Sequence, residues 1–115
     1  MSCFIGDHLP PGPGQQKRVA AFIEEHVADD IPVRVLAGLV DLSPYHFARA
    51  FKRSFGVPPH RYHVGQRIER AKAHLRDRSV TEVALAVGFA ETSSFSAAFR
   101  RTTGATPQDY RRTLG

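Results

Sequence analysis

Side chains suited to binding a polyanion recur in two short stretches of the sequence. In the first stretch Tyr45, Arg49 and Lys52 are spaced by four and three residues, and Ser93 and Ser96 hold comparable places in the second. At about 100° per residue, such spacing puts the side chains of each stretch on one side of a helix. A guanidinium can donate two hydrogen bonds to guanine O6 and N7, a chemistry that suits the base edges of duplex DNA.

The charge of the chain is distributed unevenly. Residues 1–41 carry 3 Lys/Arg and 6 Asp/Glu, whereas residues 42–115 carry 13 Lys/Arg and 5 Asp/Glu, so a net charge of −3 precedes one of +8. A basic C-terminal part favours a polyanionic partner, and a solvated basic surface is the alternative interpretation. Four cationic side chains within or just after the two stretches suit phosphate contacts: Lys52, Arg53, Arg100 and Arg101.

The strongest organisational signal is an internal repeat of residues 33–62 in residues 80–110. Apolar residues recur first at an offset of 47, and a later set that includes glycine, proline and tyrosine recurs at an offset of 48. One extra residue therefore falls near residues 88–91, where a surface turn tolerates an insertion. Two copies of one supersecondary unit are predicted. The matched residues of the first copy are Val33, Leu36, Ala37, Val40, Phe47, Ala50, Phe51, Gly56, Pro59 and Tyr62.

Each copy is expected to form a helix, a tight turn and a second helix. Ser79 and Glu82 have the spacing of a capping box, which opens the first helix of the second copy. Gly88 suits the left-handed backbone at the exit from that helix. In the first copy, Ser43 followed by Pro44 signals the start of the second helix.

The second helix of each copy is amphipathic. Helices at about residues 44–55 and 92–103 should end at Gly56 and Gly104. A helix, a tight turn and a steeply angled second helix make a helix-turn-helix unit, whose second helix can enter a DNA major groove. The sides expected to face the core carry Phe47, Ala50, Phe51 and Ser54 in one copy and Phe95, Ala98, Phe99 and Thr102 in the other.

Further helices are predicted outside these pairs. An apolar face from Gln15 to about Val27 predicts one helix, and Pro59–Arg76 predicts a long helix between the copies. Thr106 before a proline signals a short last helix. The chain is thus expected to be all-α. The expected divisions are a flexible tail or linker at 1–14, a first helix-turn-helix subdomain at 15–57, a linking helix at 58–77 and a second helix-turn-helix subdomain at 78–115.

No enzyme chemistry emerges from the sequence. His60 and His63 have the i, i+3 spacing of a metal-binding pair, but no motif supplies a third ligand. No serine lies in a nucleophile elbow, and no glycine-rich phosphate loop carries its lysine. We therefore expect no enzymatic activity, no metal and no cofactor.

The composition favours a cytoplasmic setting. Cys3 is the single cysteine, so the chain can build no disulfide framework. No apolar run approaches the ~18–20 residues that span a bilayer. The N-terminus also lacks the basic start and long apolar stretch of a secretory signal. We expect no membrane partner.

Residues 42–62 and 80–112 resemble the DNA-binding domain of the AraC/XylS family of bacterial transcription regulators. The second stretch carries an A-x-x-x-G-F arrangement at residues 84–89 and F-x-x-x-F-(K/R)-(K/R)…G-x-(T/S)-P-x-x-(Y/F)-R at residues 95–111. The resemblance covers about Gln15–Arg112. It implies about seven helices in two tandem helix-turn-helix subdomains joined by a long central helix. It also implies that two recognition helices enter successive major-groove segments about 34 Å apart.

The resemblance also assigns roles to the outward side chains of the two recognition helices. Ala48 and Ala97 stand where relatives often carry long polar side chains, so they can contact a thymine methyl but cannot hydrogen-bond. We expect the first helix to supply most base discrimination and the second mainly backbone contact. The base-reading candidates are Tyr45, His46, Ala48, Arg49, Thr92, Ser93, Ser94, Ser96 and Ala97, and the phosphate candidates are Ser43, Lys52, Arg53, Arg100 and Arg101.

The function expected from these features is sequence-specific binding of double-stranded DNA as a transcription regulator. The resemblance implies RNA polymerase as a further partner and activation as a mode of action, with repression left open. It also implies an effector-binding domain if the chain is part of a longer regulator, and a stand-alone protein is the other alternative. The alternative function is a helical protein-interaction module without DNA contact. Such a module would present a neutral or apolar outer face instead of Tyr45, Arg49 and Lys52.

Overall fold

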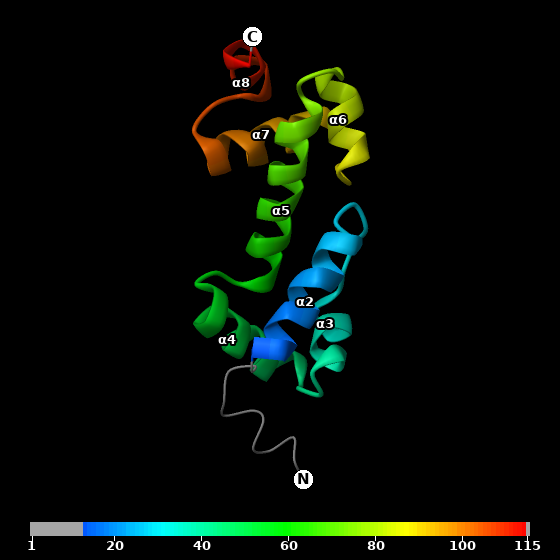
Figure 1. The fold of residues 1–115 in the computed structure, drawn as a ribbon, viewed down its shortest axis with the longest axis vertical. Helices are drawn as coiled ribbons and strands as arrows, with labels where there is room; N and C mark the ends of the chain where they lie inside the picture. The colour runs from blue at the N-terminus through cyan, green and yellow to red at the C-terminus, as the bar shows by residue number, and fades with distance from the viewer. Residues whose placement is uncertain (1–12, 115) are drawn as a thin grey trace. The chain divides into compact units, whose positions relative to one another are not determined.

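The structure of the chain, a computed structural model, describes residues 13–114 (Figure 1). These residues contain seven α-helices and no strand, which confirms the predicted all-α fold. Within the same residues, no helix is both long and apolar enough to cross a membrane. The helices are α2 (Pro13–Glu25), α3 (Val33–Leu39), α4 (Pro44–Phe55), α5 (Pro59–His74), α6 (Val80–Ala86), α7 (Thr92–Thr103) and α8 (Pro107–Thr113).

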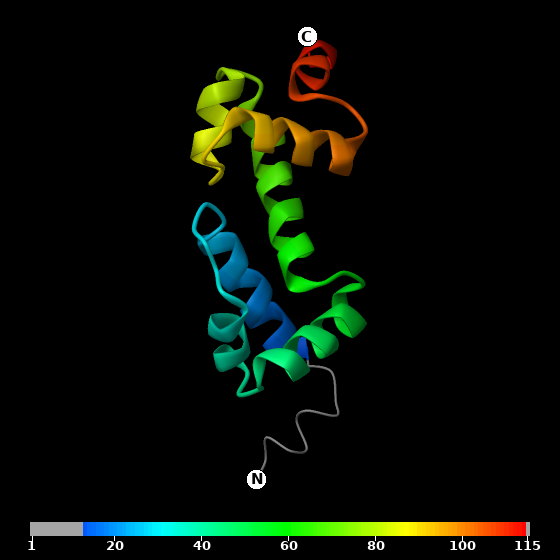
Figure 2. The same ribbon diagram turned by 180° about the vertical axis from the view of Figure 1, so that it is seen from behind.

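The described residues divide into two compact units, and the first comprises residues 13–26 and 30–63. In this unit α3 packs against α4 and α2 (Figure 2). Phe47 and Phe51 are fully buried, and the Phe51 ring stacks on Phe55 with centroids 4.1 Å apart. The remaining buried members of this core are Val19, Ile23, Leu36, Ala37 and Val40.

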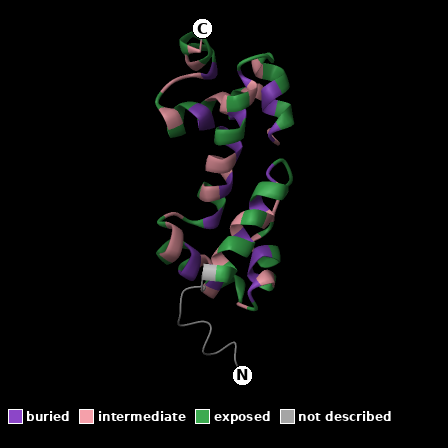
Figure 3. Ribbon diagram, viewed as in Figure 1, coloured by how far each residue is buried: buried purple, intermediate pink, exposed green. Residues whose placement is uncertain are grey.

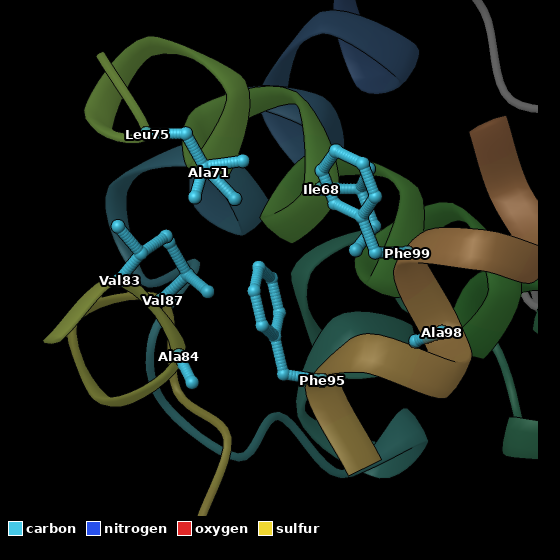
Figure 4. Packing of buried hydrophobic residues seen from close by; sticks show 9 residues of the cluster. All are labelled: Ile68, Ala71, Leu75, Val83, Ala84, Val87, Phe95, Ala98 and Phe99. Atoms are coloured by element: carbon cyan, nitrogen blue, oxygen red, sulfur yellow. The ribbon is translucent and has the colours of Figure 1, made fainter. Parts of the chain in front are cut away.

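The second unit comprises residues 27–29 and 64–114 and has a core of its own. In Figure 4 the Phe95 ring points into a cluster contributed by α5, α6 and α7. Ile68, Ala71 and Leu75 are fully buried and form the side of the central helix segment that faces this core. The other members of the cluster are Val83, Ala84, Val87, Ala98 and Phe99. The domain boundaries drawn from the sequence at residues 57 and 77 stay a prediction.

The helices of the two units confirm the sequence repeat. The first helices of the copies, α3 and α6, each have 7 residues, and the second helices, α4 and α7, each have 12. Gly56 and Gly104 end α4 and α7 with φ of 83° and 85°. Only glycine adopts this left-handed backbone without a steric cost, which is why both helices stop there.

The three side-chain caps predicted from the sequence are all formed. Ser43 accepts a hydrogen bond from the His46 backbone N at 3.2 Å, and Thr106 caps α8 in the same way. Ser79 accepts from Glu82 N at 3.1 Å, while the Glu82 carboxylate accepts from Ser79 N at 3.0 Å, so the capping box is complete. The pKa of Glu82 is lowered chiefly because the Ser79 backbone N–H donates to its carboxylate and so favours the charged form.

The turns inside the two copies locate the extra residue. Asp41 in the first turn and Gly88 in the second both have positive φ, 59° and 102°. The next amide in each copy donates to the carbonyl five residues earlier, at 3.1 Å for Leu42 and 2.9 Å for Phe89. The two backbones are therefore equivalent up to this point. The insertion predicted in the second turn consequently falls at residues 90–91.

Three details differ from the sequence-based expectations. Helix α2 begins at Pro13 rather than Gln15 and ends at Glu25 rather than at about Val27. Proline is tolerated at the start because it lacks only an amide hydrogen that a first helical residue leaves unpaired in any case. The rest of the expected tail, residues 1–12, lies outside the described residues. Helix α5 ends at His74, where Arg78 N donates back to the His74 carbonyl at 3.1 Å.

The third difference is that Thr102 is exposed, although it was expected to face the core. Thr103 is the half-buried residue of that last turn, and its hydroxyl bonds to the Phe99 carbonyl at 2.9 Å. Ser54, which corresponds to Thr102 in the first copy, is half-buried as predicted. The last turn of α7 therefore departs slightly from the simple helical projection.

Candidate nucleic-acid interface

Helix α4 presents a polar, cationic side opposite its buried phenylalanines. Tyr45 is 64% exposed, and Arg49, Lys52 and Arg53 are also exposed. Ala48 lies half-buried on the same side. Figure 3 shows the alternation of buried and exposed residues along this helix. Because the phenylalanines fix the rotation of α4 about its axis, they determine which side chains face solvent.

Tyr45 and Arg49 are hydrogen-bonded to each other on this surface. Arg49 Nη1 donates a hydrogen bond to the Tyr45 hydroxyl at 3.0 Å, and the guanidinium carbon lies 5.7 Å from the centre of the tyrosine ring. The residues are four apart, so they are neighbours on the helix surface. The sequence placed both on the outer side, but it did not indicate that they would pair.

Ser43 and His46 make a second polar contact in the first turn of α4. The Ser43 hydroxyl lies 2.7 Å from His46 Nδ1, in addition to capping the helix. The His46 ring meets the Tyr45 ring edge-on, with centroids 5.3 Å apart. Ser43 was predicted to contact phosphate, and in this conformation its hydroxyl is engaged within the helix start. The four side chains from Ser43 to Arg49 that carry polar atoms thus form one connected group.

The C-terminal half of α4 carries concentrated positive charge. Arg49, Lys52 and Arg53 line an open hollow of about 510 Å³. Lys52 and Arg53 lie in the last turn, where cations interact favourably with the helix dipole. Three exposed cationic side chains around this shallow, open surface can neutralise an anion such as a phosphate.

Helix α7 presents smaller side chains at the matching positions. Ser93, Ser94 and Ala97 are exposed, whereas Thr92 and Ser96 are half-buried. The Thr92 hydroxyl lies 3.5 Å from that of Thr81 on α6, at the limit of a hydrogen bond. Small side chains allow the helix to approach a partner closely, but they offer few hydrogen-bond donors. The exposed cations Arg100 and Arg101 follow in the last turn.

Comparison with known proteins places this pair of helices in a family. A family profile described as a helix-turn-helix domain matches residues 36–113, which is more than half of the chain. The chain is a DNA-binding helix-turn-helix domain of the AraC/XylS family. The DNA-binding domain of AdpA, a global transcriptional factor solved in complex with a target DNA, is 32% identical. Its structure matches with a TM-score of 0.78 over 85% of this chain and 90% of that one.

Longer regulators contain segments similar to this AraC/XylS-family domain. The regulatory protein PocR of Salmonella typhimurium is 34% identical over 106 residues, which cover 90% of this chain and 35% of PocR. The XylDLEGF operon transcriptional activator 1 of Pseudomonas putida is 37% identical over 98 residues, which cover 81% of this chain and 30% of the activator. The chain therefore spans about a third of the length of these two relatives.

Arg67 is a buried cation of the AraC/XylS-family domain that the sequence analysis did not single out. It is only 9% exposed. Its Nε donates to the Val27 carbonyl at 2.8 Å and its Nη2 to the Asp29 carbonyl at 2.9 Å. The guanidinium carbon also lies 5.4 Å from the centre of the Phe89 ring. Within the second unit, Arg67 thus connects residues 27–29 to the turn that precedes α7.

Replacing Arg67 with alanine should lower the free energy of unfolding by about 2–3 kcal/mol. The loss has two sources, because two carbonyls lose their donor and Phe89 loses the group packed against it. Urea unfolding followed by circular dichroism measures the change. Arg61→Ala is the matched control, because Arg61 is an exposed arginine of the same helix, and it should change stability by less than about 0.5 kcal/mol. Equal effects of the two substitutions would refute this role for Arg67.

The histidine pair of α5 does not form a metal site with other described residues. His63 is 8% exposed, whereas His60 is exposed. Among residues 13–114, no group of three or more His, Cys, Asp or Glu side chains is placed to hold a metal ion. Both histidines line a small pocket of about 250 Å³ in the first unit, together with apolar residues from the segment before α3, from α3 and from the start of α5.

Proposed function

We propose that this AraC/XylS-family domain binds double-stranded DNA sequence-specifically and acts as a transcription regulator. The observation that carries the proposal is the two-sided construction of α4 and α7. Each helix buries a phenylalanine pair completely and turns polar and cationic side chains to solvent. A helix of this kind, second in a helix-turn-helix unit, fits the major groove of B-DNA.

The two helices are proposed to contribute unequally. In α4, Arg49 is the base reader, because its guanidinium can donate to guanine O6 and N7 together. Tyr45, His46 and Ala48 lie near it and supply further base contacts. In α7 the candidates are small, so we infer that this helix contributes close backbone approach and shape fit more than hydrogen-bonded readout. Its base-reading candidates are Thr92, Ser93, Ser94, Ser96 and Ala97.

Phosphate contacts are proposed for the cations at the ends of the two helices. Lys52 and Arg53 of α4 and Arg100 and Arg101 of α7 are exposed and lie in the last turns. Such contacts position a protein on DNA without reading sequence. The Ser43 hydroxyl can donate to a phosphate in the tautomer in which His46 Nδ1 carries the ring proton, because the hydroxyl then acts as acceptor toward His46.

Selection of bound sequences from a pool of random duplexes tests the proposed function. Two conserved half-sites, with centres about one helical turn of ~10 base pairs apart, are expected. With about five to eight phosphates neutralised, log Kd should rise by about 0.9 per contact for each tenfold increase in salt concentration. Failure to enrich any sequence, together with a Kd independent of salt, would favour the protein-interaction module instead.

The division of labour between the helices is tested on the selected duplex. Arg49→Ala should weaken discrimination against a substituted guanine by about 1–3 kcal/mol, or roughly 5- to 150-fold. Ser96→Ala should leave sequence preference nearly unchanged, because Ser96 is half-buried and offers a single hydroxyl. Loss of preference in Ser96→Ala but not in Arg49→Ala would reverse the proposed assignment.

The wider regulatory role is also a proposal. We infer that DNA-bound protein contacts RNA polymerase and activates transcription, by analogy with the activator from Pseudomonas putida. If this sequence belongs to a longer regulator, we infer that the rest of that regulator includes an effector-binding domain. PocR is such a longer regulator, because the matched segment covers only 35% of its length. Transcription in vitro from a promoter containing the selected site, with purified polymerase, distinguishes activation from repression.

A further inference from the structure

The side chains at the start of α4 form an ordered chain of contacts. The Ser43 hydroxyl contacts His46 Nδ1 at 2.7 Å, and the His46 ring packs edge-on against Tyr45. The Tyr45 hydroxyl then accepts a hydrogen bond from Arg49 Nη1 at 3.0 Å. Each member is held by its neighbour, although Tyr45 itself is 64% exposed. An exposed arginine otherwise samples many rotamers, and holding it in one costs conformational entropy on binding.

The pairing leaves Arg49 able to read a base. A guanidinium has five N–H donors, and the hydrogen bond to Tyr45 uses one of them. Two of the remaining donors are enough for guanine O6 and N7. Because the Tyr45 oxygen acts as acceptor toward Arg49, its own proton is available for an acceptor on the partner. The pair therefore presents a fixed set of donors.

We propose that the Tyr45 hydroxyl is a positioning group that holds the Arg49 guanidinium for guanine recognition. This inference rests on the proposed function and specifies how its first helix discriminates. Helix α7 has no comparable pair at the equivalent positions, which are Ser93 and Ala97. Guanine dependence should accordingly be concentrated in the half-site that α4 contacts.

The test compares the wild type with Tyr45→Phe, which removes the hydroxyl and keeps the ring. The probes are the selected duplex, the same duplex with 7-deazaguanine at the α4 half-site guanine, and a scrambled duplex. The wild type should lose about tenfold or more in affinity when N7 is removed. Tyr45→Phe should reduce that loss by at least ~3-fold, because the guanidinium is no longer held toward N7. The affinity of each protein for the scrambled duplex gives the baseline of nonspecific binding, and the readout is the ratio of affinities for the guanine and 7-deazaguanine duplexes of one and the same protein.

Tyr62→Phe is the matched control. It removes the hydroxyl of a tyrosine whose ring packs edge-on against Phe51 and Phe55 in the core of the first unit. This variant should keep the full wild-type loss on 7-deazaguanine. A Tyr45→Phe variant that also keeps the full loss would overturn the proposal, as would a wild type insensitive to 7-deazaguanine at every guanine of the α4 half-site. Equal affinity of the wild type for selected and scrambled duplexes is a different result, because it would refute the proposed function itself.

Discussion

Alanine at Gly88 should lower the free energy of unfolding by about 3 kcal/mol or more. Gly88 has a φ of +102°, a region that residues with a Cβ atom rarely adopt. A Cβ placed there would lie 2.6 Å from the Ala28 carbonyl oxygen and 2.9 Å from Arg67 Cζ. The first neighbour is backbone and the second is held by its own hydrogen bonds, so neither can move away without loss.

Gly56→Ala and Gly104→Ala are the controls that separate the two causes. Both glycines have positive φ, 83° and 85°, yet a Cβ at either position meets nothing within 4 Å. Each substitution should therefore cost only the conformational penalty of about 1–2 kcal/mol. Urea unfolding of the three variants, followed by circular dichroism, measures the differences. If Gly88→Ala were no more destabilising than the two controls, the close packing of residues 27–29 against this turn would be wrong.

Replacing Phe95 with alanine should cost about 3–5 kcal/mol of stability. The side chain is fully buried, and its ring centroid lies 5.7 Å from that of Phe99 and 5.5 Å from that of Phe89. Removing it deletes apolar contacts and leaves a cavity that the surrounding helices of the second unit can fill only in part. Domains of this size have total stabilities of roughly 5–15 kcal/mol, so a large fraction would be lost.

Thermal unfolding of Phe95→Ala beside Ser94→Ala provides the measurement. Ser94 precedes Phe95 on the same helix but is exposed, so its substitution should change stability by about 0.5 kcal/mol or less. Phe47 holds the equivalent place in the first unit, is also fully buried, and should behave like Phe95. A loss below about 1 kcal/mol for Phe95→Ala would contradict the core described for the second unit.

Much of the fold follows from local and periodic features of the sequence. The caps at Ser43 and Ser79 are hydrogen bonds between residues close together in the chain, so they form without contacts from distant segments. Gly56 and Gly104 end helices because few other residues tolerate the left-handed backbone. The period of the apolar residues decides which side of each helix is buried. Because the two copies repeat, the helices predicted in one copy support those predicted in the other.

The candidate interface was predictable in its membership but not in its internal contacts. Tyr45, Arg49 and Lys52 were placed on one side by helical spacing alone, and they are exposed on α4. The hydrogen bond between Tyr45 and Arg49 depends on the rotamers of two long side chains, which no sequence period specifies. The engagement of the Ser43 hydroxyl with His46 has the same origin.

The amino-acid sequence by itself determined the helices, their caps, the duplicated unit and the polar sides of α4 and α7. These features depend on interactions between residues that are near neighbours in the chain. Only the tertiary structure decided that Arg67 is buried and that Gly88 has no room for a side chain. Both facts arise from residues 27–29, about 40 and 60 positions away, which pack against them in the folded unit. From the sequence alone, a charged residue on a helix can be exposed or buried, and a glycine in a turn can have open space or close neighbours beside it. Packing against distant segments decides which of these holds.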